Sequence, residues 1–247
     1  MEAFYDWFRW LYDEHGFNFV IFYESYERER FVRGFITTIY ISIACLVFSI
    51  VIGIVGAWLQ GSHFKITRNI VQGYIQFFRN TPPLVQLFFF YFGLGIYTPS
   101  YDAGGWQEPV IGSFGWAVIS LSFFAGAFNV EIFRAGIEAV PTATREAAES
   151  LGYSRLKAYI YIILPLAFRV SLPALNNNLV NLVKTTTLAY AIAVPEMMYT
   201  ANQIWSDNVN VPEMMFVLFI VYVSLVGVLV WAMHRWEHNM RIPGYGT

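Results

Sequence analysis

Four ionisable side chains stand in stretches of the sequence that are otherwise nearly free of charge: Arg79, Glu131, Arg134 and Lys184. A charged group is costly in an apolar environment, so such residues mark solute pathways, gates or internal ion pairs. Glu131 and Arg134 are three residues apart and are expected to pair with each other. Arg79 is expected to extend its head group toward water. For these three residues we favour structural or gating ion pairs over contact with a solute.

Lys184 is the cation best suited to hold an anionic group. Asn177, Asn181 and Lys184 follow one another at i, i+4 and i+7, which places them on one helical face. An ammonium group can bind a carboxylate while the amides bond other polar groups. We interpret this face, with the adjacent Thr185, as the lining of a solute pathway. The alternative is that the amides join neighbouring helices.

The first hydrophobic segment carries hydroxyl and small residues at helical spacing. Thr38 and Ser42 share a face, for which helix packing is the favoured role, although both are also candidates for the pathway. Gly34, Gly53 and Gly56 are expected to allow close contact between helices.

The composition indicates that the helices carrying these side chains lie in a membrane. Of the 247 residues, 57% are apolar and 13% are charged, whereas a typical soluble domain has about 25% charged residues. Lipid is therefore the expected solvent. The formal net charge of −2 gives no reason to expect nucleic acid. Cys45 is the single cysteine, so neither a disulfide framework nor a cysteine metal site is expected.

The hydrophobic pattern predicts five membrane-spanning helices, since a span needs about 20 mostly apolar residues. They are expected at roughly 35–60, 68–97, 109–139, 168–194 and 214–234. Pro82 and Pro83 should break the second of them, because proline removes backbone donors and clashes with the preceding turn.

The distribution of lysine and arginine predicts the orientation. The loops at 97–110 and 195–212 contain neither residue, whereas the alternate connections do, so the positive-inside rule places the N-terminus outside and the C-terminus inside. The chain is accordingly divided into an extracytoplasmic or interfacial segment at 1–33, a transmembrane domain at 34–240 and a cytoplasmic tail at 241–247.

The polar insert at 141–165 between the third and fourth spans predicts two short helices. Thr142 or Thr144 is expected to cap the first helix, and Gly152 to end it in a left-handed turn. Ser154 should cap a second helix, which Pro165 would bend. One interpretation is a capped loop helix without a partner. The other is a compact knob on which a second protein docks, since Ala147 and Ala148 leave one side of the first helix thin.

The spacing E-A-A-x3-G-x9-I-I-L-P in this insert resembles the EAA loop of ABC importer permeases. Three further segments, at 79–94, 129–141 and 181–188, resemble the polar amino acid permeases of the histidine, glutamine and glutamate type. The similarity runs in order from about residue 32 to the end.

The chain departs from that family's pattern at Asn80, Pro83, Ala135 and Thr185. Thr185 stands where the family usually has Asp, which removes a possible acid beside Lys184 and leaves the partner of that lysine open.

The resemblance implies the all-α, MetI-like fold of a type I importer permease in a bacterial inner membrane. Such a subunit forms the pathway for a polar L-amino acid and hydrolyses nothing itself. It implies a second permease, with a sister heterodimer favoured over a homodimer. It also implies two ATPase subunits that carry ATP and Mg, and an extracytoplasmic binding protein; no cofactor is expected on this chain. The residues that the resemblance assigns to ATPase coupling are Glu146, Ala147, Ala148, Gly152, Leu164 and Pro165.

Two other classes of protein fit the sequence less well. The sequence contains neither a phosphate-binding G-x-x-x-x-G-K-[ST] loop nor the H-E-x-x-H and G-x-S-x-G motifs. An intramembrane enzyme that used Glu131 would lack a nucleophile or metal beside it. A freestanding secondary transporter or channel often shows internal repeats, which this sequence does not, and it would leave the insert without a role.

Overall fold

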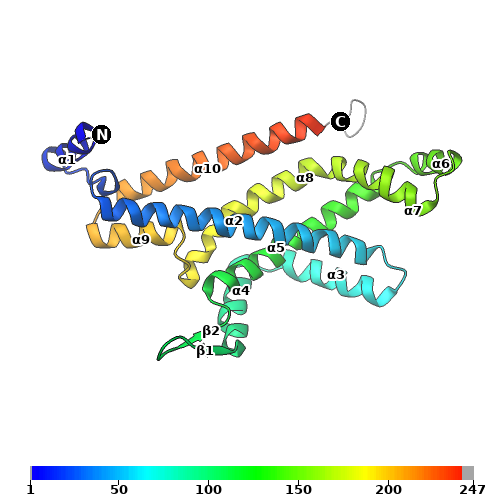
Figure 1. Cartoon of the computed structure of the whole chain (residues 1–247), viewed down its shortest axis with the longest axis horizontal. Helices are drawn as coiled ribbons and strands as arrows, with labels where there is room; N and C mark the ends of the chain where they lie inside the picture. The colour runs from blue at the N-terminus through cyan, green and yellow to red at the C-terminus, as the bar shows by residue number, and fades with distance from the viewer. Residues whose placement is uncertain (1, 241–247) are drawn as a thin grey trace. The chain divides into compact units, whose positions relative to one another are not determined.

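The computed structural model describes residues 2–240, and the predicted tail at 241–247 lies outside the described residues. The described part is helical apart from one hairpin, as Figure 1 shows. Helices η2 and η4 are π-helical, and η1, η3 and η5 are 3-10 helices. The elements are α1 Glu2–His15, η1 Val20–Phe22, α2 Ser25–Gln60, α3 Lys65–Asn80, α4 Pro83–Phe88, η2 Phe89–Leu94, η3 Gly95–Tyr97, β1 Ser100–Asp102, β2 Gln107–Pro109, α5 Ser113–Glu138, α6 Thr142–Ser150, α7 Arg155–Ala158, η4 Tyr159–Ile163, α8 Leu164–Thr185, η5 Thr186–Ile192, α9 Met197–Asn208 and α10 Val211–Met240.

Four continuous helical stretches of the described chain are long and apolar enough to cross a membrane. They cover Ser25–Gln60, Ser113–Glu138, Arg155–Ile192 and Val211–Met240. These correspond to the first, third, fourth and fifth predicted spans, although the third starts at Ser113 because the preceding residues form the hairpin. The all-α class is thereby confirmed for the spanning part of the chain.

The second predicted span is broken, at the place where the proline pair predicts it. Helix α3 ends at Asn80, Thr81 is extended, and α4 begins with Pro83 at its first position, where a missing N–H costs nothing. The apolar stretch that follows, Pro83–Tyr97, is shorter than the four long helices. Gln86 secures the break, because its side-chain amide donates to the backbone oxygens of Phe78 at 2.9 Å and Thr81 at 3.0 Å.

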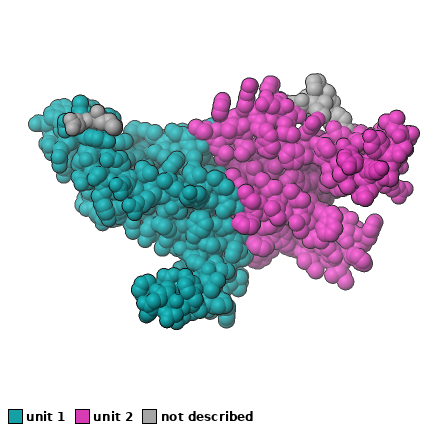
Figure 2. Space-filling model, in the orientation of Figure 1, with its two compact units in different colours: residues 1–44, 87–119, 183–227 teal, residues 45–86, 120–182, 228–247 magenta. Residues whose placement is uncertain are grey.

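The chain divides into two compact units, which Figure 2 colours separately. Unit 1 comprises residues 1–44, 87–119 and 183–227, and unit 2 comprises residues 45–86, 120–182 and 228–247. Several helices begin in one unit and end in the other, so each unit is assembled from segments distant in the sequence.

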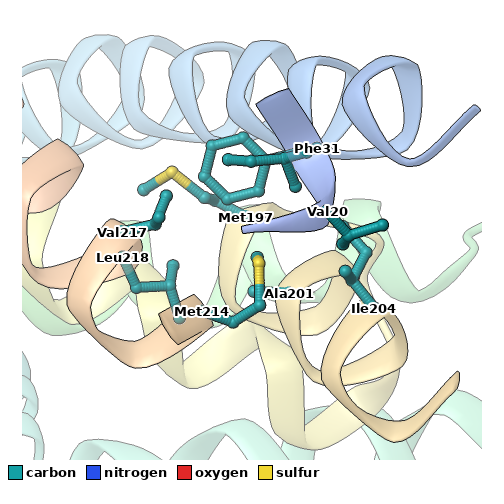
Figure 3. Packing of buried hydrophobic residues seen from close by; sticks show 9 residues of the cluster. Val20, Phe31, Met197, Ala201, Ile204, Met214, Val217 and Leu218 are labelled. Carbon is teal, nitrogen blue, oxygen red and sulfur yellow. The ribbon is translucent and has the colours of Figure 1, made fainter. Parts of the chain in front are cut away.

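The core of unit 1 brings η1, α2, α9 and α10 together. In Figure 3, buried side chains from these elements point toward one another, among them Phe31 from α2, Met197 and Ile204 from α9, and Met214 from α10. Gly34 of α2 lies directly against Thr200 of α9, so the expected role of that glycine in close helix contact is confirmed.

A buried acid, Glu196, starts helix α9 in unit 1. Its carboxylate accepts hydrogen bonds from the backbone N–H of Met198 at 3.0 Å and of Tyr199 at 2.8 Å, which is a helix N-cap. The hydroxyl of Tyr222 donates to it at 3.1 Å. Burial raises the pKa of the Glu196 carboxyl above its ordinary value, although these three hydrogen bonds oppose that change.

The core of unit 2 joins parts of α2, α3, α5 and α8. Ile75, Val130 and Leu175 are buried at its centre. Gly53 lies against Asn129 and Gly56 lies against Val130, so a side chain at either glycine would collide with α5. Both close contacts were expected from the sequence and are confirmed.

The hairpin β1–β2 in unit 1 is antiparallel, with Tyr101 opposite Glu108. Its tip is held by Asp102, which accepts hydrogen bonds from the backbone N–H of Gly104 at 3.0 Å and of Gly105 at 2.8 Å. Hydrogen bonds from the indole of Trp106 and then from the hydroxyl of Tyr101 lower the pKa of the Glu108 carboxyl. The hairpin was not expected, since its strands are three residues long.

Candidate functional site

The insert between α5 and α8 forms two short helices, as predicted. Helix α6 ends in a Schellman motif, in which the N–H of Tyr153 donates to Ala148 and the N–H of Gly152 donates to Glu149. Gly152 has a φ of +85°, the left-handed conformation expected of it. Ser154 caps α7 and accepts from the N–H of Lys157, which is also as predicted.

The start of α6 differs from the prediction. The residue at the N-cap is Pro141, which has no side-chain oxygen to accept a hydrogen bond, and α6 begins at Thr142. The prediction that Thr142 or Thr144 caps the helix was therefore wrong. The physical reason is that proline already fixes the extended backbone that an N-cap needs, so the chain can start the helix without a capping side chain.

Pro165 is accommodated by a change of helix type. The proline has no N–H and would clash with the carbonyl four residues earlier in an α-helix. The turn just before it, Tyr159–Ile163, is π-helical, which moves the chain past the obstruction. Leu164 and Pro165 are both exposed. The bend predicted at Pro165 is replaced by this π-helical turn.

The insert presents a mixed polar and apolar surface. Glu146 and Ala147 are exposed, whereas Ala148 is buried against its own unit. Leu151 and Leu156 are 79% and 68% exposed, which is high for leucine on a surface without a partner. A hollow of about 650 Å³ lies between α6 and the α7–η4 segment, with charged groups of both signs along its rim. The insert therefore offers a concave surface beside Glu146, one of the candidate coupling residues.

A buried cluster attaches this insert to the helices that flank it. Val140, which follows the end of α5, packs with Ile163 of η4 and Ala167 of α8. Helix α6 also packs on the π-helical turn η4. The insert is therefore held by packing against α8 and the residues that follow α5, within the same unit.

The proposed pathway face of α8 is outward-facing. Asn177, Asn181 and Lys184 are all exposed, although each has one buried and one half-buried neighbour in the sequence. None of the ion pairs between described residues includes Lys184. The structure thus places these three residues on one face, as their spacing predicts, and leaves their role as a prediction.

Two other asparagines of α8 make the interhelical bonds. Asn178 donates to the side chain of Asn129 at 2.8 Å and to the backbone oxygen of Ala125 at 3.1 Å. Asn176 donates to the carboxylate of Glu237 in α10 at 3.3 Å. Asn176 and Asn178 thus have the helix-joining role that is the alternative for Asn177 and Asn181, and the role of those two residues stays a prediction.

Thr38 and Ser42 are buried in unit 1. The hydroxyl of Thr38 donates to the backbone oxygen of Gly34 at 3.1 Å and accepts from the N–H of Met197 at 3.0 Å. These contacts are consistent with the packing role favoured for Thr38, and the candidate pathway role of both residues stays a prediction. Thr185 is half-buried at the end of α8.

The ion pairs differ from those expected. Glu131 pairs with Arg79 of α3 and not with Arg134. The guanidinium of Arg79 also lies over the ring of Phe128, 5.1 Å from its centroid, and the residue is still exposed, so its extension toward water stays a prediction. Arg134 pairs with Glu138 one turn further along α5, at 3.2 Å. Glu131 of α5 thus compensates the charge of Arg79 in α3. Spacing within one helix cannot predict such a pair, because the two residues lie on different helices.

Asn129 is the residue that sequence reasoning missed. It is fully buried in α5 and its amide donates to the hydroxyl of Ser49 in α2 at 3.3 Å, while it accepts from Asn178 of α8. It thereby links three helices of unit 2. Its position in an otherwise apolar run, facing Gly53, was the available signal.

Long apolar helices with a charged, exposed insert between two of them indicate an integral membrane protein. Residues 49–241 match the family described as binding-protein-dependent transport system inner membrane component, and the chain belongs to this family. It is therefore a multi-pass inner-membrane permease subunit of an ABC importer. ATP hydrolysis in such systems is carried out by a separate ATPase.

Curated relatives and a solved structure agree with this assignment. The chain is 34% identical over 185 residues to the probable amino-acid permease protein YxeN of Bacillus subtilis (strain 168), covering 75% of this chain and 80% of that protein. It is 29% identical over 211 residues to the glutamine transport system permease protein GlnP of Escherichia coli (strain K12), covering 85% and 93%. A solved amino acid ABC transporter superposes with a TM-score of 0.75 at 27% identity, covering 86% of this chain and 94% of that one.

Proposed function

We propose that the chain imports a polar L-amino acid as one of two permease subunits, and that the α6–α7 insert is the surface on which an ATPase subunit docks. The curated relatives named above are amino-acid permeases, which supports the solute class. The observation that carries the docking proposal is the exposed, internally closed insert, anchored to α5 and α8 by the cluster around Ile163. Leu151 and Leu156 add exposed apolar area to this charged insert, which suits contact with a protein partner.

The topology belongs to this proposal. Helices α3 and α4 with the following turns make up a fifth, broken span, so the chain crosses the bilayer five times. The N-terminus lies outside and the C-terminus inside. The charge distribution supports this arrangement, because the hairpin loop and the α9 loop contain no lysine or arginine.

The solute pathway is assigned to the exposed face of α8. Lys184 supplies a cation for the carboxylate, and Asn177 and Asn181 supply amides for other polar groups of the amino acid. Burying such a face against a second permease would complete the pathway. A sister permease is favoured as that partner over a second copy, with two ATPase subunits inside and a binding protein outside.

The coupling proposal is tested by purifying the tagged chain with its partners in mild detergent and measuring ATPase activity with the binding protein and single amino acids. Glu146→Lys and Gly152→Asp should abolish amino-acid-stimulated ATP hydrolysis and release the ATPase subunit, while membrane insertion stays normal. Gly152→Asp strains a left-handed residue that has open space around it, so the strain is local to the insert.

Matched controls are available on the same chain. Gly105→Asp places the same side chain at another left-handed glycine with open space, in the hairpin. Glu14→Lys reverses an equally exposed acid at the end of α1. Both controls should retain the ATPase. Stimulated hydrolysis and transport that persist in the Glu146 and Gly152 variants would show that the insert does not couple the two subunits.

A further inference from the structure

A second feature of unit 2 has no role in the transport proposal. A groove of about 350 Å³ lies between the C-terminal half of α2, the end of α5 and the start of α8. This volume is in the range of ligand pockets, about 300–1,000 Å³. Its walls are aliphatic and aromatic and include Phe133 of α5, Phe168 of α8, and Ile54 and Trp58 of α2.

The groove is lined mainly by apolar groups. The hydroxyl of Ser171 is already bonded to the backbone oxygens of Ala167 at 2.9 Å and Ile132 at 3.2 Å, and the other polar groups of the lining belong to Trp58 and Tyr159, which also line a neighbouring hollow. A water molecule needs two to four polar partners, which the apolar walls do not supply. The occupant that fits is therefore a hydrocarbon chain.

One end of the groove is polar. A second hollow of about 580 Å³ shares Ala57, Trp58, Ile137 and Tyr159 with the first and adds Gln60, His63, Arg134 and Glu138. The two hollows therefore form one amphipathic site, with apolar walls at one end and hydrogen-bonding groups at the other.

The polar end has unused bonding capacity. The guanidinium of Arg134 has five N–H donors, and among the described residues it donates one hydrogen bond, to Glu138 at 3.2 Å. The side-chain oxygen of Gln60 is buried and accepts no hydrogen bond from any described residue, although the amide nitrogen donates to Gln72 at 2.9 Å. A ligand that accepts from Arg134 and donates to Gln60 would satisfy both.

We propose that this site binds a membrane phospholipid. One acyl chain fills the groove beside Phe133 and Phe168, the phosphate accepts hydrogen bonds from Arg134, and an ammonium or hydroxyl of the head group donates to Gln60. The rim favours lipid over a protein partner. Ile54 and Trp58 are 54% and 72% exposed on a helix long enough to cross a membrane, and tryptophan is enriched where the hydrocarbon core meets water.

The site adjoins the ATPase-facing surface. Tyr159 lines the groove, its polar end and the hollow beside α6. A lipid in contact with Tyr159 would therefore touch the same π-helical turn that supports the insert. This proposal does not depend on which solute is carried.

The test uses the assembled complex in nanodiscs that contain a phosphatidylethanolamine with a diazirine on one acyl chain. After illumination, the labelled peptides are mapped by mass spectrometry. Labels should concentrate on Phe133 and Phe168, and an excess of unlabelled phosphatidylethanolamine should suppress them. Ile137→Trp fills the groove and should remove this labelling, whereas Ile66→Trp, at an exposed position of α3, should not.

The head-group contacts are tested separately. Arg134→Gln should lower the phosphatidylethanolamine that remains bound through detergent purification by about tenfold, equivalent to about 1.4 kcal/mol. Arg68→Gln, an exposed arginine of α3 outside the site, should leave it unchanged. Labelling spread evenly over the apolar helix α10, or cross-links from the groove to another permease chain, would overturn the proposal. The competition experiment on the unaltered chain decides the case even if a variant fails to fold.

Discussion

The hydrogen bond between Asn129 and Asn178 gives a quantitative prediction about unit 2. Asn129→Ala removes two side-chain bonds, one to Ser49 and one from Asn178. Asn178→Ala likewise removes two, one to Asn129 and one to the backbone of Ala125. Alanine is the right replacement, because it keeps the Cβ of Asn129 that packs against Gly53.

The magnitude follows from the number of bonds. An interhelical hydrogen bond in a membrane protein contributes about 0.6 kcal/mol on average and at most about 1.7 kcal/mol. Each single variant should therefore lose about 1.2 kcal/mol of unfolding free energy. The double variant should lose less than the two single losses together, by about 0.6 kcal/mol, because the shared bond can be removed only once.

The assay is reversible denaturation in mixed detergent micelles followed by circular dichroism, on the wild type, both single variants and the double variant. Asn177→Ala is the control, since it removes the same side chain from the next position of the same helix, on an exposed face. It should change the unfolding free energy by less than about 0.5 kcal/mol. Strictly additive single losses, or an equal loss in the control, would refute the assignment of Asn129 and Asn178 as a helix-joining pair.

Three further outcomes are expected. Gly34→Val should destabilise unit 1 by about 1–3 kcal/mol, measured by thermal unfolding, because its side chain would collide with Thr200. Trp106→Phe should raise the pKa of Glu108 toward its ordinary value. Because the pKa of Glu108 is lowered in the folded hairpin, the ionised carboxylate stabilises the hairpin at neutral pH, and this stabilisation is lost as the pH falls. Hydrogen exchange of the hairpin should therefore change less between neutral and acidic pH in the variant than in the wild type. Lys184→Gln should reduce uptake of radiolabelled amino acid by at least about tenfold while leaving the unfolding midpoint unchanged, because an exposed residue contributes little to stability.

Local backbone chemistry was readable from the sequence. Gly152, Ser154 and the proline pair at 82–83 each act through one or two neighbouring peptide groups, and the structure uses all of them as expected. The failure at Pro141 is of the same local kind, because proline supplied the backbone conformation that a capping threonine was expected to provide.

The assignment of buried and exposed asparagines was not readable. Helical periodicity shows that Asn177 and Asn181 share a face. It does not show which face is turned inward, because a helix in lipid is apolar on the lipid-facing side as well as on the packed side. Asn176 and Asn178 lie on either side of Asn177, and both are bonded to other helices. The same limit explains Glu131, whose partner Arg79 is 52 residues away in the sequence and is reached only through the packing of α3 on α5.

The π-helical turn Tyr159–Ile163 sets an angular relation between the insert and the helix it supports. An α-helix advances by about 100° per residue, so the one extra residue in this turn rotates the faces of α7 relative to those of α8 by about that angle. Deleting a single residue here would restore α-helical phase and swing the exposed Leu156 around the axis without altering any surface side chain. The direction from which a second protein can approach is therefore encoded as a helical phase, independently of the residues that touch it.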